Sequence, residues 1–173
     1  MTMAASDPKS RELIQTVSQI SNGLMGEVAK VIIGKQENLR KVSIGILSNA
    51  NMLIEDYPGL AKTLMANTFA TALGCKFKRV QFTPDLLPAD IMGTYMYDQQ
   101  AGEFKLRPGP LFTNVLLADE INRAPPKTQA ALLEAMEEKQ VTIEGITHKL
   151  PAPFITICLL YTSDAADEGV SVG

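Results

Sequence analysis

The sequence predicts an α/β fold in which helices cover a parallel β-sheet and a ligand binds where the strands end. Residues 52–63 combine a short apolar strand, a turn that contains proline and glycine, and the start of a helix. Residues 115–118 form a second apolar strand, which ends in two adjacent acids, Asp119 and Glu120. In open parallel sheets, ligands bind at the carboxyl ends of the strands. We therefore expect both segments to contribute to one site.

Length and composition indicate one globular domain. The chain has 173 residues, of which 46% are apolar and 20% charged, and this suffices to bury a core. A net charge of −3 gives no electrostatic basis for nucleic acid as the main partner. The cations at Lys76, Lys78 and Arg79 are expected to form a solvated strand edge.

Cysteine usage and hydropathy predict a cytoplasmic protein. Cys75 and Cys158 lack metal-site spacing, so we expect free thiols in a reducing compartment. No apolar run approaches the ~18 residues of a membrane span, and the start of the chain lacks the pattern of a signal peptide.

Two helices are expected before the first strand. From Ser10 onward, apolar residues recur every three or four positions, which predicts one buried helical face. That face contains Leu13, Val17, Ile20, Leu24, Val28 and Val31. Gly23 and Gly26 weaken the helix, and a break near them is compatible with the pattern. A second helix begins at about Gln36, with Leu39, Val42 and Ile46 on its apolar face.

Helices, strands and two hairpins follow in the remaining sequence. Residues 62–73 are expected to form a helix that Gly74 ends, with an inward face of Leu64, Met65, Thr68, Phe69 and Ala72. Residues 76–82 read as a strand, and residues 94–97 with 103–106 as a β-hairpin.

A further helix is expected to begin at Pro125 and Pro126, where a missing N–H group is harmless. Its predicted inward face is Gln129, Leu132, Leu133 and Met136. Residues 141–143 and 146–150 predict a second hairpin, on which His148 is expected to be exposed. Residues 154–157 are expected to be the next buried strand.

The turn after residue 55 has the order of a phosphate-binding loop. In the pattern G-x-x-x-x-G-K-[ST], backbone N–H groups surround the phosphates, the lysine reaches the outer ones and the hydroxyl binds magnesium. Lys62 and Thr63 match this pattern, whereas Asp56 and Ala61 replace its two glycines. On this motif alone, an ordinary turn after a buried strand is an equally good interpretation.

The two acids supply the other half of such a site. Asp119 is suited to hold Mg²⁺ and Glu120 to polarise an attacking water. Taken alone, the pair is explained equally well by solvated acids at a helix or strand end. Because the acids follow a Lys-Thr loop in the same chain, we favour one phosphate-and-magnesium site.

Three blocks of sequence resemble the MoxR family of AAA+ ATPases over about residues 31–157. These blocks are Gln81–Pro88, Gly102–Phe104 with Arg107–Pro110 and, most specifically, Leu117–Gln129 with Ala131–Met136. The most specific part is the Asp-Glu-Ile-Asn-Arg-Ala-Pro-Pro segment of the third block. The resemblance implies a three-layer P-loop NTPase parallel sheet with β-hairpin insertions, which binds ATP and Mg²⁺. It also implies a ring, usually a hexamer, that remodels or matures client proteins, often beside partners with a von Willebrand factor type A domain.

The resemblance assigns roles to individual residues. Glu120 would be the catalytic base, with Thr63 and Asp119 on the magnesium side. The nucleotide-binding residues would be Asp56, Tyr57, Pro58, Gly59, Leu60, Ala61, Lys62, Thr63 and Leu64. Ile33 and Gly34 resemble the segment that lies beside the adenine, although a simple turn between helices explains them equally well.

The sequence departs from the family after residue 157. The family continues with Ala-Thr-Gln-Asn-Pro, whereas residues 158–173 resemble translated sequencing-adaptor sequence. We therefore expect an N-terminal helical segment at 1–30, a partial ATPase core at 31–157 and a non-native tail at 158–173; a divergent natural tail is the alternative. On this interpretation, the chain is truncated before the sensor asparagine, the arginine finger, the last core strand and the helical lid.

The leading hypothesis is Mg²⁺-dependent ATP hydrolysis. We expect low activity in this chain, because the arginine finger is expected to be missing and such residues contribute about 10³–10⁵ in rate. A nucleotide-dependent protein-binding module without turnover is the main alternative, and a phosphotransferase is the next. A chain that exposes apolar surface and does not fold stably is a further alternative.

Overall fold

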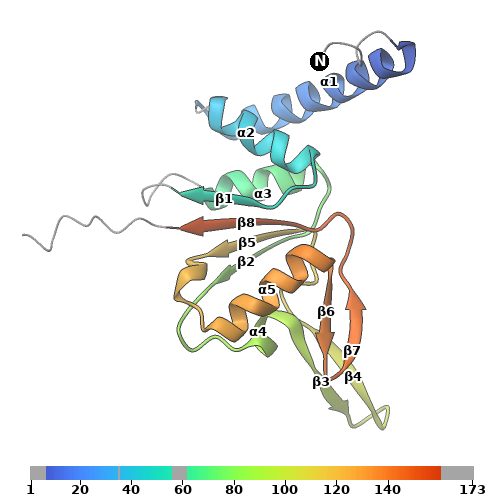
Figure 1. The fold of residues 1–173 in the computed structure, drawn as a ribbon, viewed down its shortest axis with the longest axis vertical. Coiled ribbons are helices and arrows are strands. Elements are labelled where there is room, and N and C mark those ends of the chain that lie inside the picture. The colour runs from blue at the N-terminus through green and yellow to red at the C-terminus, as the bar shows by residue number, and fades with distance from the viewer. Residues whose placement is uncertain (1–6, 35, 56–61, 161–173) are drawn as a thin grey trace, which may run out of the picture.

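A four-stranded parallel sheet forms the centre of the molecule (Figure 1). The computed structural model describes residues 7–34, 36–55 and 62–160. The sheet has the order β1 (Met52–Glu55), β8 (Ile155–Leu160), β5 (Val115–Asp119) and β2 (Phe77–Gln81). Each neighbouring pair is parallel. The predicted α/β fold with a parallel sheet is therefore confirmed.

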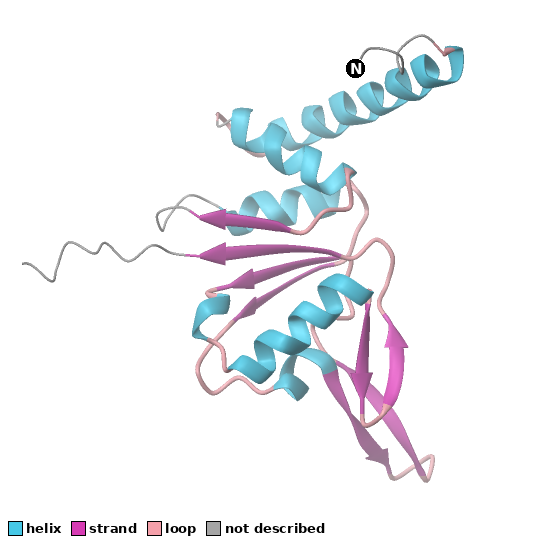
Figure 2. Cartoon of the chain, viewed as in Figure 1, coloured by secondary structure: helices cyan, strands magenta, loops and turns pink. Residues whose placement is uncertain are grey.

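Helices lie on both faces of this sheet, as Figure 2 shows. On one face are α1 (Pro8–Ala29), α2 (Gln36–Leu47) and α3 (Lys62–Ala72), and α5 (Pro126–Glu138) lies on the other. Strand β5 is buried along its whole length. Successive side chains of β5 point into opposite layers. Leu117 packs with residues of α3, and Leu116 packs with residues of α5. This arrangement forms the three layers that we expected.

Two hairpins extend from the α5 side of the sheet (Figure 1). The first pairs β3 (Gly93–Asp98) with β4 (Glu103–Pro108), and the second pairs β6 (Gln140–Ile143) with β7 (Ile146–Lys149). The short helices α4 (Pro88–Met92) and η1 (Ile121–Arg123) complete the fold. Both hairpins agree with the sequence prediction.

His148 is half-buried, so its predicted exposure was wrong. Its Nε2 atom lies 3.1 Å from the hydroxyl of Tyr95 on the other hairpin. Its ring also makes an edge contact with Phe112. The hairpins fold toward each other, and this long-range contact has no signature in the local sequence.

Helix α1 is continuous through Gly23 and Gly26, but only part of its apolar face enters the core. Leu24 and Val28 are buried, whereas Leu13, Val17 and Ile20 are exposed. The predicted inward face is therefore correct only toward the C-terminal end of the helix. The other half projects beyond α2 and α3 in Figure 1, which leaves those side chains without a layer to pack against.

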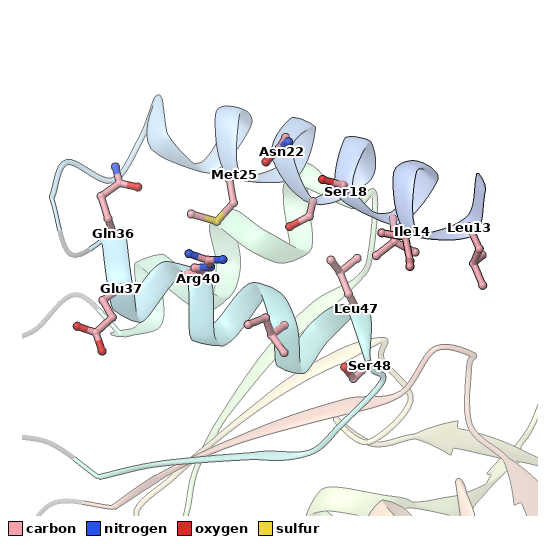
Figure 3. A pocket seen from close by; sticks show the side chains of 13 residues that line it. Leu13, Ile14, Ser18, Asn22, Met25, Gln36, Glu37, Arg40, Leu47 and Ser48 are labelled. Carbon is pink, nitrogen blue, oxygen red and sulfur yellow. The ribbon is translucent and has the colours of Figure 1, made fainter. Parts of the chain in front are cut away.

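A groove of about 1040 Å³ lies between α1 and α2 (Figure 3). Leu13 and Val17 line it from α1, and Ile44, Leu47 and Arg40 from α2. The exposed half of the α1 face therefore borders an open groove, and neither Asp119 nor Glu120 lines it.

Other inward predictions were also incorrect in part. Thr68 and Phe69 are buried, but Leu64 and Ala72 on α3 are exposed. On α5, Leu132 is buried while Leu133 is exposed. These errors share a cause, since the apolar residues on each helix span more than the face that contacts the sheet.

The last strand is longer than predicted. β8 extends to Leu160 and pairs with β1 as far as Glu55. Cys158 to Leu160 therefore lie in the sheet, although we placed them in the tail. These residues continue the buried run of a strand that lies between two parallel neighbours.

Both cysteines are free thiols, as predicted. Burial raises the pKa of the Cys158 thiol to about 11, so this thiol stays neutral at physiological pH. Within the described ranges, no helix is long and apolar enough to cross a membrane.

Adjacent leucines on α5 test the assignment of its buried face. Leu132 is 0% exposed and Leu133 is 51% exposed. We expect Leu132→Ala to lower the free energy of unfolding by about 3–5 kcal/mol, because it creates a cavity. The matched Leu133→Ala should lower it by less than about 1 kcal/mol. Urea unfolding of both variants measures the difference, and equal losses would contradict the described orientation of α5.

Candidate functional site

The carboxyl ends of β1, β5 and β8 lie at one edge of the sheet (Figure 1). β1 leads to residues 56–61 and then to α3, while β5 ends at Asp119. The predicted loop residues Asp56, Tyr57, Pro58, Gly59, Leu60 and Ala61 lie outside the described residues. Lys62 is buried at the start of α3, and Thr63 is half-buried beside it.

The remaining predicted nucleotide contacts differ in their surroundings. Leu64 is exposed on α3. Ile33 and Gly34 form the turn between α1 and α2, where Ile33 is 95% exposed and Gly34 has a φ of +82°. This geometry suits an interhelix turn, and the contacts of these residues with a nucleotide stay predictions.

Asp119 is a buried acid whose side chain has one hydrogen-bond partner among the described residues. Its side chain is 1% exposed, and its Oδ2 atom accepts a hydrogen bond of 2.6 Å from Nη2 of Arg79. Its Oδ1 atom is buried and has no hydrogen-bond partner among the described residues. A buried carboxylate oxygen without a partner is unfavourable, since it has lost its water.

The donor set at Asp119 fits magnesium. Mg²⁺ prefers oxygen ligands and is commonly held by one or two carboxylates, with substrate phosphates and water completing the shell. The Oδ1 atom of Asp119 is such a ligand. Within the described ranges, no cluster of three or more His, Cys, Asp or Glu residues forms a metal cage. A metal here would therefore complete its shell with water or other non-protein ligands.

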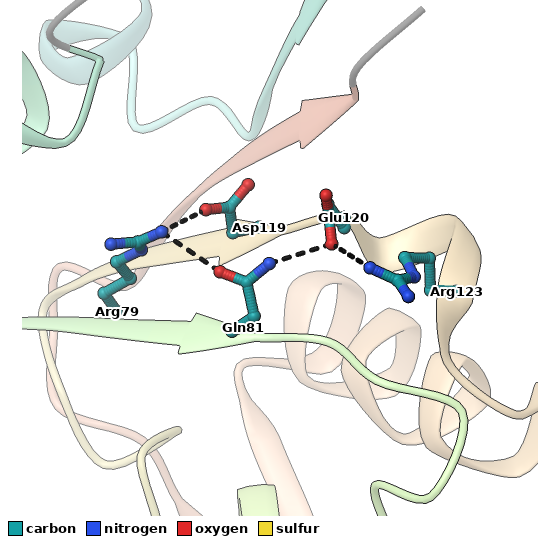
Figure 4. Close-up of polar contacts among 5 residues, drawn as sticks. All are labelled: Arg79, Gln81, Asp119, Glu120 and Arg123. Carbon is teal, nitrogen blue, oxygen red and sulfur yellow. Dashed lines mark hydrogen bonds and ion pairs between the residues drawn. The ribbon is translucent and has the colours of Figure 1, made fainter. Parts of the chain in front are cut away.

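Glu120 leaves the strand in a left-handed backbone conformation. Its φ is 56° and its ψ is 44°, which is uncommon for a residue other than glycine. Its backbone N–H donates a hydrogen bond of 3.1 Å to the carbonyl of Leu159 on β8. Successive side chains of a regular strand point to opposite faces. In Figure 4, by contrast, the carboxylates of Asp119 and Glu120 lie on the same side of β5.

Two hydrogen bonds hold the Glu120 carboxylate, and both end on Oε2. Nη1 of Arg123 and Nε2 of Gln81 each donate over 2.8 Å. Arg123, followed by Gln81, lowers the pKa of Glu120. The group is therefore ionised at neutral pH, which is the state that a general base requires.

The two acids are linked through strand β2 (Figure 4). Arg79 and Gln81 are two positions apart, so their side chains lie on the same face of the strand. Nη2 of Arg79 donates to Oδ2 of Asp119 and, over 3.0 Å, to Oε1 of Gln81. Gln81 donates in turn to Glu120.

Sequence reasoning missed both members of this link. It assigned Arg79 to a solvated strand edge, whereas its guanidinium binds a buried carboxylate. The period of a strand predicts that Arg79 and Gln81 share a face. Which strand they face depends on the strand order, which the local sequence does not contain.

Comparisons with known proteins indicate the family of the chain. Residues 51–168 match the ATPase family associated with various cellular activities (AAA). The chain is 49% identical over 131 residues to Chaperone MoxR1 of Mycobacterium tuberculosis, covering 76% of this chain and 35% of that protein. It is 30% identical over 130 residues to Protein MoxR of Methylorubrum extorquens, covering 72% and 38%.

A solved structure is also similar. The crystal structure of a candidate ATPase from Cytophaga hutchinsonii has a TM-score of 0.77 and 41% identity, covering 92% of this chain and 49% of that one. The chain thus spans between about a third and a half of the length of these relatives.

The contact between Arg123 and Glu120 predicts a measurable shift. Arg123→Ala should raise the pKa of Glu120 toward its ordinary value, because Arg123 is the largest cause of the lowered value. A lowered pKa in the folded state stabilises the fold above the unfolded-state pKa. That contribution is lost as the pH falls through the folded-state pKa. Arg123→Ala should therefore lose less stability than the unsubstituted chain over this acidic range.

NMR titration of the Glu120 carboxyl carbon measures the shift. Arg107→Ala is the control, since Arg107 contacts Met96 on the first hairpin. An unchanged Glu120 titration in Arg123→Ala would show that the ion pair does not form in solution.

Proposed function

The chain belongs to the MoxR family of AAA+ ATPases, and from this premise we propose that it supplies the phosphate-binding and water-activating parts of a Mg²⁺-dependent ATPase. The observation that carries the proposal is the acid pair at the end of β5. Asp119 is buried with an oxygen that has no hydrogen-bond partner among the described residues, and Glu120 is ionised beside it.

The two acids have separate roles in this proposal. The Oδ1 atom of Asp119 and the hydroxyl of Thr63 would hold the Mg²⁺ ion. Bound Mg²⁺ would neutralise charge on the phosphates. Glu120 orients the attacking water and accepts its proton. Because both of its hydrogen bonds end on Oε2, we assign Oε1 to the water.

Lys62 completes the proposed phosphate site. It is the first residue of α3, and a helix N-terminus favours anions because its N–H groups are unpaired. Its placement at the same end of the sheet as Asp119 supports a role on the outer phosphates (Figure 1). The contacts proposed for residues 56–61 and for Ile33 and Gly34 follow from family membership alone.

We also propose the family's assembly and use of ATP. The full-length protein would form a ring, usually a hexamer, that remodels or matures client proteins beside partners with a von Willebrand factor type A domain. The first hairpin offers a surface for such contacts, since Met96, Tyr97 and Phe104 are exposed on it. Exposed aromatic residues are enriched where proteins bind one another.

Turnover by the 173-residue chain itself should be low. We propose that its native ATPase sequence gives way to a non-native tail near residue 158, so that the sensor asparagine expected there is replaced. Losing a group that positions the attacking water lowers the rate of the chemical step.

A binding module without turnover is the alternative. The observation that favours it is the restraint on Glu120, whose Oε2 is already held by Gln81 and Arg123. A base held in this way must still reach a water for hydrolysis to proceed.

Replacing the proposed base separates these functions. In the full-length gene product that contains this chain, Glu120→Gln should lower ATP turnover by about 10²-fold or more, because an amide cannot accept the proton. ATP affinity should stay nearly unchanged. Phosphate release and binding of a fluorescent ATP analogue measure the two quantities.

Glu137→Gln, an exposed substitution on α5, is the matched control. Equal turnover in Glu120→Gln and the unsubstituted protein would exclude Glu120 as the base. ATP binding without phosphate release by the unsubstituted protein would instead support the binding module.

A further inference from the structure

Asp119 and Arg79 form an unequal ion pair. The Asp119 side chain is 1% exposed, while that of Arg79 is 46% exposed. Asp119 is fixed by the backbone of β5, which pairs with β2 on one side and β8 on the other. Arg79 holds its guanidinium on a long side chain that reaches solvent. The Asp119 carboxylate therefore cannot leave the interior, whereas the Arg79 guanidinium can.

A buried carboxylate needs a compensating positive charge. Removing one member of a buried ion pair is strongly destabilising, because the remaining charge is left in a medium of low polarity. Among the described residues, Arg79 is the cation in ion-pair contact with Asp119. A divalent cation bound at Asp119 would supply the same compensation, and two cations beside one carboxylate would repel each other.

We propose that Arg79 is an internal counter-ion, which holds Asp119 while no divalent cation is bound and gives it up when one binds. This inference rests on the proposed function in one respect, the placing of Asp119 on the magnesium side. Arg79 then sets the affinity for the metal, since binding has to replace an existing ion pair.

Arg79 also positions the base through Gln81. A guanidinium only donates hydrogen bonds and an ionised carboxylate only accepts them. The Gln81 amide therefore satisfies Arg79 and Glu120 together in one orientation, with Oε1 toward Arg79 and Nε2 toward Glu120. When Arg79 leaves Asp119, the amide loses the partner that fixes this orientation. Arg79 is thus a positioning residue that connects the metal side of the site to the base.

The test is the thermal stabilisation of the 173-residue chain by magnesium without nucleotide. A ligand that binds only the folded state raises Tm according to its affinity. We expect Arg79→Met to lower Tm in metal-free buffer. Millimolar MgCl₂ should then raise the Tm of Arg79→Met at least about twice as much as it raises the Tm of the unsubstituted chain, because no guanidinium competes with the metal. KCl at matched ionic strength corrects for screening.

Two matched variants control for the loss of a positive charge. Lys78→Met removes a cation from the next position of β2, whose side chain points to the opposite face. Lys105→Met removes a cation of the first hairpin, where its partner is Asp98. Both should respond to MgCl₂ as the unsubstituted chain does.

A double variant connects the effect to Asp119. Adding Asp119→Asn to Arg79→Met removes the uncompensated charge, so it should recover Tm in metal-free buffer and abolish the response to MgCl₂. If Arg79→Met alone is unfolded without metal, MgCl₂ should restore its fold, and a chain that stays unfolded overturns the proposal.

Other outcomes overturn it as well. An equal or smaller rise in Arg79→Met would mean that Arg79 and the metal occupy Asp119 together or independently. A larger rise that survives Asp119→Asn would place the metal elsewhere. Since no nucleotide is present and no turnover is measured, these outcomes are distinct from a failure of the Glu120→Gln experiment.

Discussion

The burial of β5 is the constraint on which the rest of the molecule depends. Every residue from Val115 to Asp119 is buried, so both faces of the strand need a covering layer and both edges need a partner strand. α3 and α5 supply the layers, and β2 and β8 supply the edges. This arrangement carries a carboxylate to the end of the strand while still inside the protein. The chemistry of Asp119 is a consequence of that position, since an exposed acid would neither need Arg79 nor present an unpartnered oxygen.

The polar link across β2 follows from the same constraint. β2 pairs with β5 so that Gln81 lies opposite Asp119 and Arg79 opposite Leu117. Two side chains on one face of β2 therefore reach both acids, whose carboxylates lie on the same side of β5 (Figure 4). The left-handed conformation of Glu120 makes this possible, because it turns the second acid back toward the first. Fold and site are thus coupled through one strand pairing and one backbone conformation.

Sequence periodicity predicted where the helices and strands lie better than it predicted which of their side chains are buried. The helices, both hairpins and the parallel strands were recovered, because periods of 3.6 and 2 residues and turn residues such as Gly74 are local signals. Leu64 and Leu133 were misassigned because helices in this chain carry apolar residues beyond the face that packs. His148 was misassigned because Tyr95 of the first hairpin contacts it. The predicted strand ended at residue 157, because the sequence departs from the family pattern there, whereas β8 continues to Leu160.

The sequence by itself determined the residue types of the site and their order along the chain. A lysine and threonine opening a helix, and two acids closing an apolar strand, imply phosphate and magnesium chemistry where such strands lie in one parallel sheet. Only the tertiary structure decided which side chains compensate those acids. Arg79 meets Asp119, and Gln81 meets Glu120, across a separation of about 40 residues. That pairing depends on strand order and register, which arise from the packing of the whole sheet and leave no local pattern in the chain.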